Sequence, residues 1–260
     1  MGNKGPTYIV GFAVAVCLVC SVLVSGAAVS LKPRQEANKV LDKQLKVLNV
    51  AGLVKEGEAL SRTEIQALYK KSVTPKVVDL RTGEYDDTVD AATYDMDKAA
   101  KDADAIDTSK SKIGLRAVAG KAVIYQIGEA GKVDLLVLPI QGKGLWSTLK
   151  GFLAVSTDGN TIKGLTYYEH GETPGLGGEI DNPRWKALWR GRKAYNAKGE
   201  PALRVIKGVA GTPEKSPHEV DGLSGATLTG KGVTNMMQFW LSEQGLGLFL
   251  KKFRAKGGAS

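Results

Sequence analysis

The chain has 260 residues, of which 43% are apolar, so it is long enough for one sizeable domain with a buried core and an additional anchor. Its formal net charge of +9 favours an anionic partner such as nucleic acid, lipid headgroups or an acidic protein. The sequence has no recognisable nucleic-acid-binding module, which argues against nucleic acid and leaves membrane lipid as the simpler partner.

An uncharged segment near the amino terminus predicts a membrane-spanning helix. Residues 8–31 contain no charged side chain, a run long enough to cross the hydrocarbon core as a helix. A secretory signal has a shorter apolar region and a cleavage site, for which Ser25-Gly26-Ala27 is only a weak candidate. The segment is therefore predicted to be an uncleaved anchor, preceded by a short tail over residues 1–7.

Both cysteines, Cys17 and Cys20, fall inside this apolar segment. A C-x-x-C pair can serve redox chemistry or hold a metal, but within one lipid-facing helix it lacks further ligands, so two small apolar residues are the simpler interpretation. The rest of the chain has no cysteine, which excludes a disulfide, a thiolate-ligated iron–sulfur cluster and a thioether-linked haem there. Any redox chemistry in that part requires an organic cofactor.

The segment after the anchor is predicted to be helical and then acidic. Apolar residues recur at helical spacing in residues 36–50, and a capping box at Ser61-Arg62-Thr63-Glu64 opens a helix that continues to residue 71. A short strand is expected over residues 77–80. Nine acidic residues between positions 84 and 107 predict a solvated surface segment, with docking of a basic partner as the alternative.

Strand patterns dominate the middle of the chain. One hairpin is expected from residues 121–127 and 133–140, which flank a loop containing Gly128 and Gly131. A second hairpin is expected from the strands 152–156 and 162–168 around Asp158-Gly159.

The last third of the chain is predicted to mix helices with one strand. Asn182-Pro183 starts a helix, residues 203–207 form a strand, and residues 227–241 form a final helix. The basic amphipathic tail, residues 246–256, suits either a membrane surface or packing on the core. The predicted fold class is therefore α+β: a single N-terminal transmembrane helix, then a mixed or antiparallel sheet with flanking helices.

Residues 221–229, Asp-Gly-Leu-Ser-Gly-Ala-Thr-Leu-Thr, are predicted to be a loop that turns into the final helix. Ser224 or Thr227 can cap that helix, which is the commoner use of these residue types. Alternatively, the unpaired N–H groups and the positive end of the helix dipole can hold a phosphate beside the Thr227 hydroxyl.

The same stretch resembles the D-G-x-S-G-A-T-x-T flavinylation motif of the membrane-bound flavoprotein subunits of redox-driven ion pumps. A second segment, His170-Gly171-Glu172-Thr173-Pro174-Gly175-Leu176-Gly177, resembles the E-T-P-G-L-G stretch that lines the flavin site in that family. The two segments occur in the family's order, and the resemblance covers most of the chain. It is strongest to the C subunits of the sodium-translocating NADH:quinone oxidoreductases, with the flavin subunit of an Rnf-type ferredoxin:NAD oxidoreductase as the related alternative.

In that family the last residue of S-G-A-T carries FMN through a phosphoester bond, so the resemblance implies covalent FMN on Thr227. Gly225 and Ala226 would let the phosphate come close. Ser224 and Thr229 would donate hydroxyl hydrogen bonds to it.

Other residues are expected around the flavin. Lys207 is the candidate cation for the phosphate, with a snorkelling surface lysine as the alternative. Leu176 and Trp146 are candidates for packing against the isoalloxazine ring, although Trp146 is otherwise a core aromatic. Glu172 and Thr173 are expected to hydrogen-bond the ring edge, with capping of their own loop as the alternative.

Other chemistries find little support. The two histidines, His170 and His218, lie far apart in sequence, so no metal site is expected. The chain has no Walker loop and no dinucleotide-binding glycine motif after a strand, so NADH is not expected to bind it. Flavin electron transfer requires no catalytic acid, base or nucleophile on the protein. One apolar span without an ionisable residue does not move an ion by itself.

The resemblance implies an FMN electron carrier in a membrane complex that oxidises NADH, reduces ubiquinone and pumps Na⁺ out of the cytoplasm. An anchored flavin-binding or sensory domain without electron relay, or an assembly subunit in which Thr227 merely caps a helix, are the alternatives of another class. The expected partners are other membrane subunits of the complex, a flavin transferase for maturation, and membrane lipid.

The resemblance also implies an inner-membrane protein of a bacterium, with residues 1–7 in the cytoplasm and the large domain in the periplasm. The basic residues after the span, Lys32, Arg34 and Lys39, favour the opposite orientation by the positive-inside rule. The orientation implied by the resemblance is preferred, because large domains are translocated largely regardless of charge. The expected parts of the large domain are a helical and acidic segment, residues 32–115, and an FMN-binding domain, residues 116–260.

Overall fold

The computed structural model describes residues 5–129 and 132–255. The chain divides into two compact units, Met1–Asp42 and Lys43–Ser260. The first unit consists mainly of residues 6–42 of helix α1 (Pro6–Val50), whose last eight residues belong to the second unit. The apolar part of α1 is long enough to cross a membrane and has no buried residue. The helix expected over residues 36–50 is the end of this same helix, which runs through Pro33. Part of the expected tail, residues 1–4, lies outside the described residues.

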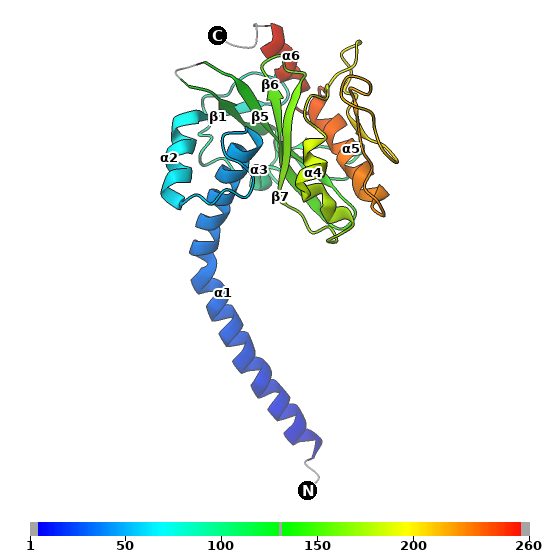
Figure 1. The fold of residues 1–260 in the computed structure, drawn as a ribbon. Helices are drawn as coiled ribbons and strands as arrows, with labels where there is room; N and C mark the ends of the chain where they lie inside the picture. Colours follow the sequence, from blue (N-terminus) through cyan, green and yellow to red (C-terminus); the bar gives the residue numbers. More distant parts are fainter. Residues whose placement is uncertain (1–4, 130–131, 256–260) are drawn as a thin grey trace. The chain divides into compact units, whose positions relative to one another are not determined.

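The second unit is built on a five-stranded sheet in the order β1-β4-β5-β6-β7, with every neighbouring pair antiparallel (Figure 1). Both expected hairpins are confirmed, although Gly131 of the first loop lies outside the described residues. The central strand β5 is buried along almost its whole length, so both faces of the sheet are covered. The strands are β1 (Val73–Asp79), β4 (Lys121–Ile127), β5 (Leu135–Lys143), β6 (Thr148–Ser156) and β7 (Ile162–Glu169).

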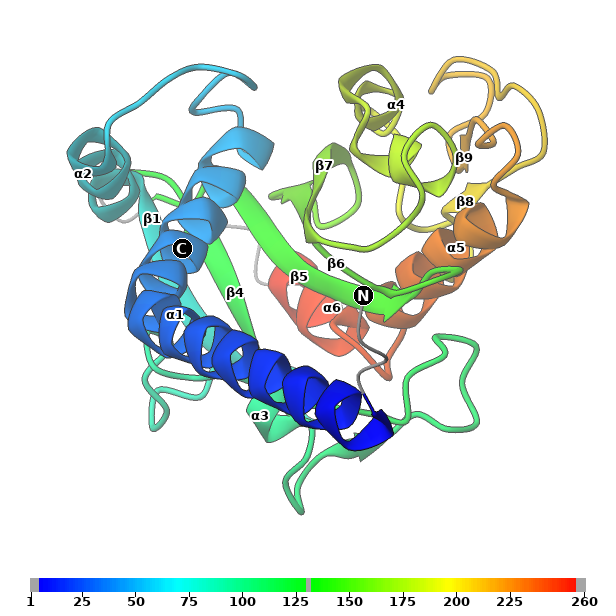
Figure 2. The ribbon, with the colours of Figure 1, turned by 90° about the horizontal axis from the view of Figure 1, so that it is seen from below.

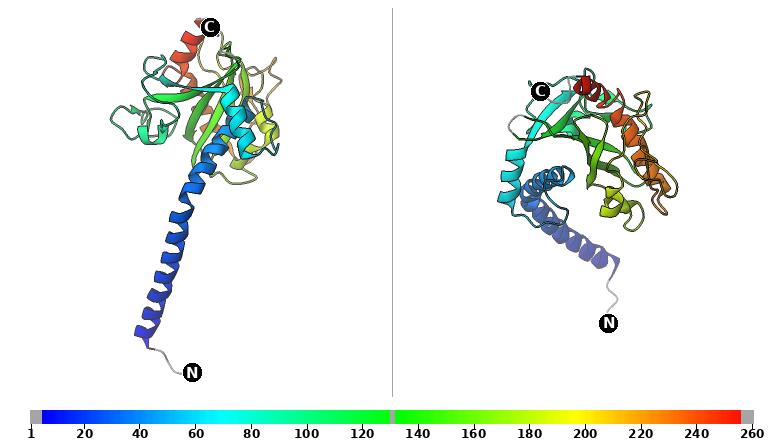
Figure 3. Two further views of the ribbon diagram at one scale, coloured as in Figure 1. Left: turned by 90° about the vertical axis from the view of Figure 1, so that its left-hand side faces the viewer. Right: turned by 45° about the horizontal axis from the view of Figure 1, so that its top comes forward.

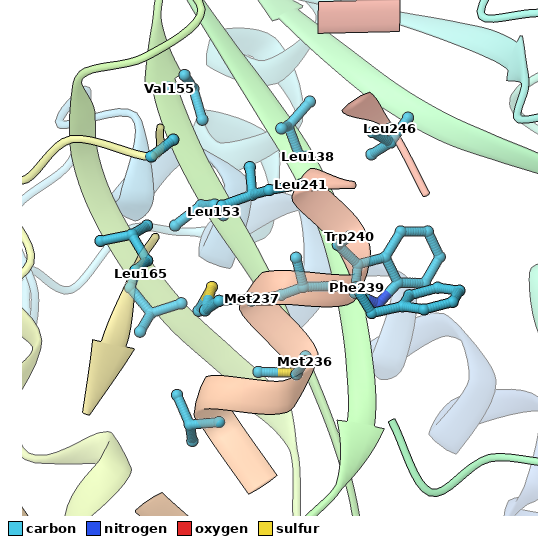
Figure 4. Close-up of a cluster of buried hydrophobic side chains, with 14 of the residues drawn as sticks. Leu138, Leu153, Val155, Leu165, Met236, Met237, Phe239, Trp240, Leu241 and Leu246 are labelled. Atoms are coloured by element: carbon cyan, nitrogen blue, oxygen red, sulfur yellow. The ribbon is translucent and has the colours of Figure 1, made fainter. Parts of the chain in front are cut away.

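Helix α5 (Thr227–Leu241) covers one face of the sheet, and its bounds are those expected from the sequence. Its apolar stripe packs against strand residues such as Leu138, Leu153 and Leu165, as Figure 4 shows. The indole Nε1 of Trp240 donates a hydrogen bond of 2.7 Å to the carbonyl oxygen of Gln141 in β5.

Glycine allows α5 and β5 to approach closely. A Cβ added to Gly232 would lie 2.3 Å from the carbonyl oxygen of Lys143, and one added to Gly142 would lie 2.9 Å from the Cβ of Met236. Because real Cβ atoms do not approach other heavy atoms this closely, these two positions require glycine. This contact fixes the first turns of α5 beside the end of β5.

The other face of the sheet is covered by α2 (Arg62–Ser72) and by residues 43–50 of α1. Tyr69 of α2 makes an edge contact with Tyr125, and the backbone of Val50 lies against Gly164 of β7. Figures 2 and 3 show α2 and α5 on opposite sides of the strands. The capping box expected at the start of α2 is confirmed, since Ser61 and Glu64 each accept a hydrogen bond from the other's backbone N–H.

The segment before the first hairpin differs from expectation. Strand β1 begins at Val73 and not at residue 77, because the chain is already extended at Val73, where α2 ends. Pro75 is tolerated in β1 because this strand lies at the edge of the sheet. The acidic segment is largely exposed but contains a short helix and a short strand that the charge pattern does not reveal. These are α3 (Met96–Ala99) and β2 (Ile106–Asp107), the latter paired with β3 (Ala117–Val118).

The elements between β7 and α5 are short. They are the 3₁₀ helix η1 (Gly177–Asp181), α4 (Pro183–Ala187), β8 (Arg204–Val205) and β9 (Glu219–Val220). Asn182 caps α4 as expected, but the strand expected over residues 203–207 has only two residues, which pair in parallel with β9.

The carboxyl-terminal helix α6 (Gly247–Ala255) packs on the core. Phe249 and Leu250 are buried, and Phe249 contacts the ring of Tyr85. Of the two alternatives for the tail, core packing is therefore the correct one for the described residues, and Lys256 lies outside them.

The α+β fold class is confirmed. Strand β1, from the expected 32–115 part, pairs with β4 from the expected 116–260 part, so the two parts share one sheet.

Candidate functional site

Helix α5 begins without a side-chain cap. The N-cap residue is Ala226, which has no polar side chain, so the alternative in which Ser224 or Thr227 caps this helix is wrong. Within the described residues, no acceptor is found for the backbone N–H groups of residues 227–229. Unpaired N–H groups and the positive end of the helix dipole make such a helix start a good position for an anion.

The Thr227 hydroxyl lies at the surface at this helix start. Thr227 is the first helical residue and is exposed, as is Ser224 before it, whereas Ala226 is buried. Gly225 has a φ of +68°, a left-handed conformation that glycine adopts without strain. The loop therefore presents Thr227 at the surface of the second unit.

The second motif lies directly against the first. A Cβ added to Gly225 would lie 2.8 Å from Cδ2 of Leu176, so the Leu176 side chain covers this glycine. Leu176 is nevertheless 44% exposed. An apolar side chain held half-exposed beside Thr227 offers a surface on which a flat apolar group can rest.

Glu172 is the most heavily bonded side chain at the site. Its carboxylate accepts hydrogen bonds from three successive backbone N–H groups, those of Leu145 (3.2 Å), Trp146 (3.0 Å) and Ser147 (3.1 Å). It also accepts one of 2.7 Å from the hydroxyl of Thr229 in α5. One buried carboxylate thus joins the loop after β5, its own loop after β7, and the first turn of α5.

Two glycines make room for this carboxylate. A Cβ at Gly144 would lie 2.6 Å from Oε1 of Glu172, and a Cβ at Gly177 would lie 2.6 Å from the Thr229 hydroxyl and 2.8 Å from Oε2 of Glu172. The clustering of glycines around this site therefore has a packing reason.

The hydrogen bonds keep Glu172 ionised despite its burial. Burial alone raises the pKa of this carboxyl group, but the bonds from Thr229 and from the backbone N–H groups of the 145–147 loop outweigh it, so the net pKa lies below the ordinary value. Glu172 holds its loop in place, which is the alternative left open by the sequence, because the bonds it makes go to the protein.

The remaining expected residues differ in exposure and in position. Trp146 is 68% exposed, so the core-aromatic alternative is wrong, and Thr173 is exposed on the loop beside Leu176. The backbone of Lys207 lies next to Gly222, and its side chain is exposed. The Thr229 hydroxyl is fully buried and donates to Glu172, which leaves it no proton to donate to a phosphate.

Lys231, for which no role was predicted from the sequence, is an exposed residue of α5 four positions after Thr227. Residues four apart in a helix share one face.

The two histidines make contacts within the protein. His170 Nε2 lies 2.9 Å from a carboxylate oxygen of Asp181, and His218 Nδ1 lies 2.8 Å from the carbonyl oxygen of Lys193. In residues 5–129 and 132–255, no group of three or more His, Cys, Asp or Glu side chains is placed to hold a metal ion.

Comparison with known proteins points to one family. Residues 144–242 match the model of the FMN-binding domain, a range that contains every residue of the site described above. The chain is 49% identical to the C subunit of the Na(+)-translocating NADH-quinone reductase of Pseudomonas aeruginosa over 251 residues, which is 95% of each chain. It is 46% identical to the same subunit from Yersinia pestis, covering 93% of this chain and 90% of the other.

Solved structures agree with this result. A crystal structure of NqrC from Shewanella oneidensis superposes with a TM-score of 0.76 at 36% identity, covering 84% of this chain and 99% of that one. A crystal structure of the C subunit of the Na(+)-translocating NADH-quinone reductase from Parabacteroides distasonis gives a TM-score of 0.64 at 28% identity, covering 85% and 96%.

Proposed function

Because this chain belongs to the family of C subunits of the Na(+)-translocating NADH-quinone reductases, we propose that it carries FMN covalently on Thr227 and relays electrons within such a complex. FMN is the cofactor of the matched domain. The single observation that carries the attachment site is the exposed Thr227 hydroxyl at the uncapped start of α5.

The side chains around Thr227 fit a flavin phosphate and ring. With a flavin dinucleotide as the donor, attachment forms one bond between the threonine oxygen and the FMN phosphorus and breaks the phosphoanhydride bond. The departing nucleoside monophosphate takes the hydroxyl proton. The N–H groups at the start of α5 and the exposed Ser224 hydroxyl would hold the added phosphate. Leu176 and Trp146 offer exposed apolar surface to the ring, and Thr173 offers a hydroxyl to its edge.

FMN supplies the redox chemistry when bound, and this chain binds and orients it. Glu172 joins the loop of residues 145–147 to its own loop, which contacts the Thr227 loop at Gly225, and Thr229 fixes that carboxylate to α5. Lys207 remains a candidate cation for the phosphate. No side chain is required to move a proton for electron transfer.

The proposal extends to the membrane. Helix α1 anchors the chain in the inner membrane, the second unit lies in the periplasm, and the partners are the other subunits, a flavin transferase and lipid. Because the second unit is proposed to lie in the periplasm, a cysteine in place of exposed Lys198 is expected to react with an impermeant thiol reagent on intact cells. The native Cys17 and Cys20 lie within the apolar helix, so they should give little background labelling. Labelling that appears only after the cells are broken would overturn the periplasmic placement.

The attachment is tested by the intact mass of the full chain expressed with a flavin transferase. We expect the mass to rise by one FMN less one water, and fragment masses to place the increment on the peptide that contains Thr227. An unmodified chain under these conditions would contradict the attachment. Co-purification with partner subunits separates an electron-relay subunit from a free-standing sensory domain.

A further inference from the structure

We propose that Lys231 is the cation that neutralises the flavin phosphodiester on Thr227. This inference rests on the proposed attachment at Thr227 and names a residue of the same site. Lys231 and Thr227 are both exposed and lie four residues apart in α5. In an α-helix such residues are neighbours on one face, with Cβ atoms about 5–6 Å apart.

The direction of helical side chains strengthens the case. The Cα–Cβ bonds of a helix tilt toward its amino terminus, so a long side chain covers the turn before its own position. The Lys231 side chain is therefore expected to extend over the first turn of α5, where Thr227 lies. The neighbouring sides of this turn are occupied, because Gly230 lies against Val205 and Gly232 against Lys143 and Gly144.

The charge of the helix start points the same way. The first turn of α5 has no acidic residue, and no carboxylate forms an ion pair with Lys231 among the residues that the structure describes. A cation near the positive end of a helix dipole is unfavourable by itself. A phosphodiester on Thr227 would reverse this, because its negative charge attracts both the dipole and the ammonium group.

Lys207 is less firmly placed for this role. It lies in the loop after β8, beside Gly222, and is followed by Gly208 at a φ of +86°. Lys231 shares a rigid helix with the modified residue, so its distance from the phosphate is set by helix geometry.

The proposal predicts that replacing Lys231 shifts the thermal unfolding midpoint in opposite directions in the unmodified and the flavinylated chain. For Lys231→Gln in the full detergent-solubilised chain, we expect the thermal midpoint to rise by about 1–3 °C without flavin and to fall by a similar amount with it. Both shifts should shrink at high salt, because exposed charges are screened. Lys231→Arg should behave as the unsubstituted chain, since it keeps the charge.

Lys198→Gln serves as the matched control and is expected to shift the two midpoints equally. Lys207→Gln tests the other candidate cation, and it is also expected to shift both midpoints equally. A purely structural role for Lys231 would shift both states in the same direction and would overturn the proposal. So would an opposite-sign pattern for Lys207→Gln with none for Lys231→Gln. If the unsubstituted chain gains no FMN mass, the attachment at Thr227 fails and this inference fails with it. If the unsubstituted chain gains that mass, but the midpoint shift of Lys231→Gln has the same sign with and without flavin, only this inference fails.

Discussion

Replacing Thr227 with alanine is expected to leave the full chain without covalent flavin while preserving its fold. The substitution removes the oxygen that would bond to phosphorus, and neighbouring hydroxyls do not replace it. Thr229 is buried and donates to Glu172, and Ser224 lies outside the helix on the other side of Gly225. Intact mass and flavin fluorescence in a denaturing gel are the measurements, with the chain expressed beside a flavin transferase.

Stability should change little in this variant. Thr227 is exposed, and its hydroxyl makes no hydrogen bond within the described part of the chain, so we expect a change within about 0.5 kcal/mol. Ser224→Ala is the matched comparison, because it removes a hydroxyl from the same loop but leaves the oxygen that bonds to phosphorus. Attachment should therefore persist in Ser224→Ala, slowed only by the loss of one hydrogen bond to the phosphate. A Thr227→Ala chain that still gains the mass of FMN would show that the flavin is carried elsewhere.

The elements that the sequence predicted well are those with a large buried face. The α5 stripe of Met236, Met237 and Trp240 meets the sheet, so burial imposes a regular period that can be read directly. Two-residue strands such as β2 and β8 have no period, since they pair over only two residues. Their positions are decided by contacts with distant parts of the chain.

The site could be predicted in location but not in its internal bonds. Thr227 and Leu176 belong to recognisable motifs, and the structure brings these motifs into contact at Gly225. The partners of Glu172 could not be predicted, because three of them are backbone N–H groups in a different loop and carry no residue-type signal. The exposure of Trp146 was likewise undetermined, since a single aromatic residue has no periodicity.

Replacing Glu172 with glutamine is expected to destabilise the second unit by about 2–4 kcal/mol, because hydrogen bonds to a charged group are each worth about 1.5–3 kcal/mol. Glutamine keeps the shape but exchanges one acceptor oxygen for an NH₂ donor, which would face the N–H groups of Leu145, Trp146 and Ser147. The thermal midpoint of the full chain should fall by about 10 °C. Attachment of FMN should also slow, because the loops beside Thr227 lose their common anchor.

The pH dependence gives a second signature. The pKa of Glu172 is lowered in the folded chain, so its contribution to stability is complete above the ordinary value of about 4.3 and is lost as the pH falls through the folded pKa. The difference in midpoint between the unsubstituted chain and Glu172→Gln should therefore be largest near neutral pH and should narrow in acid.

Two further variants distinguish the loss of the Glu172 hydrogen bonds from a general effect of removing a charge. Glu179→Gln, in the same loop, loses a carboxylate that accepts only from the Asn182 side chain within the described part of the chain, so its thermal midpoint should change little.

Thr229→Val removes the hydroxyl that donates to Glu172 while keeping the side-chain volume. Because the two residues share a bond of 2.7 Å, Thr229→Val should cost less stability in the Glu172→Gln background than alone. Additive effects of the two substitutions would mean that the carboxylate does not couple α5 to its loops.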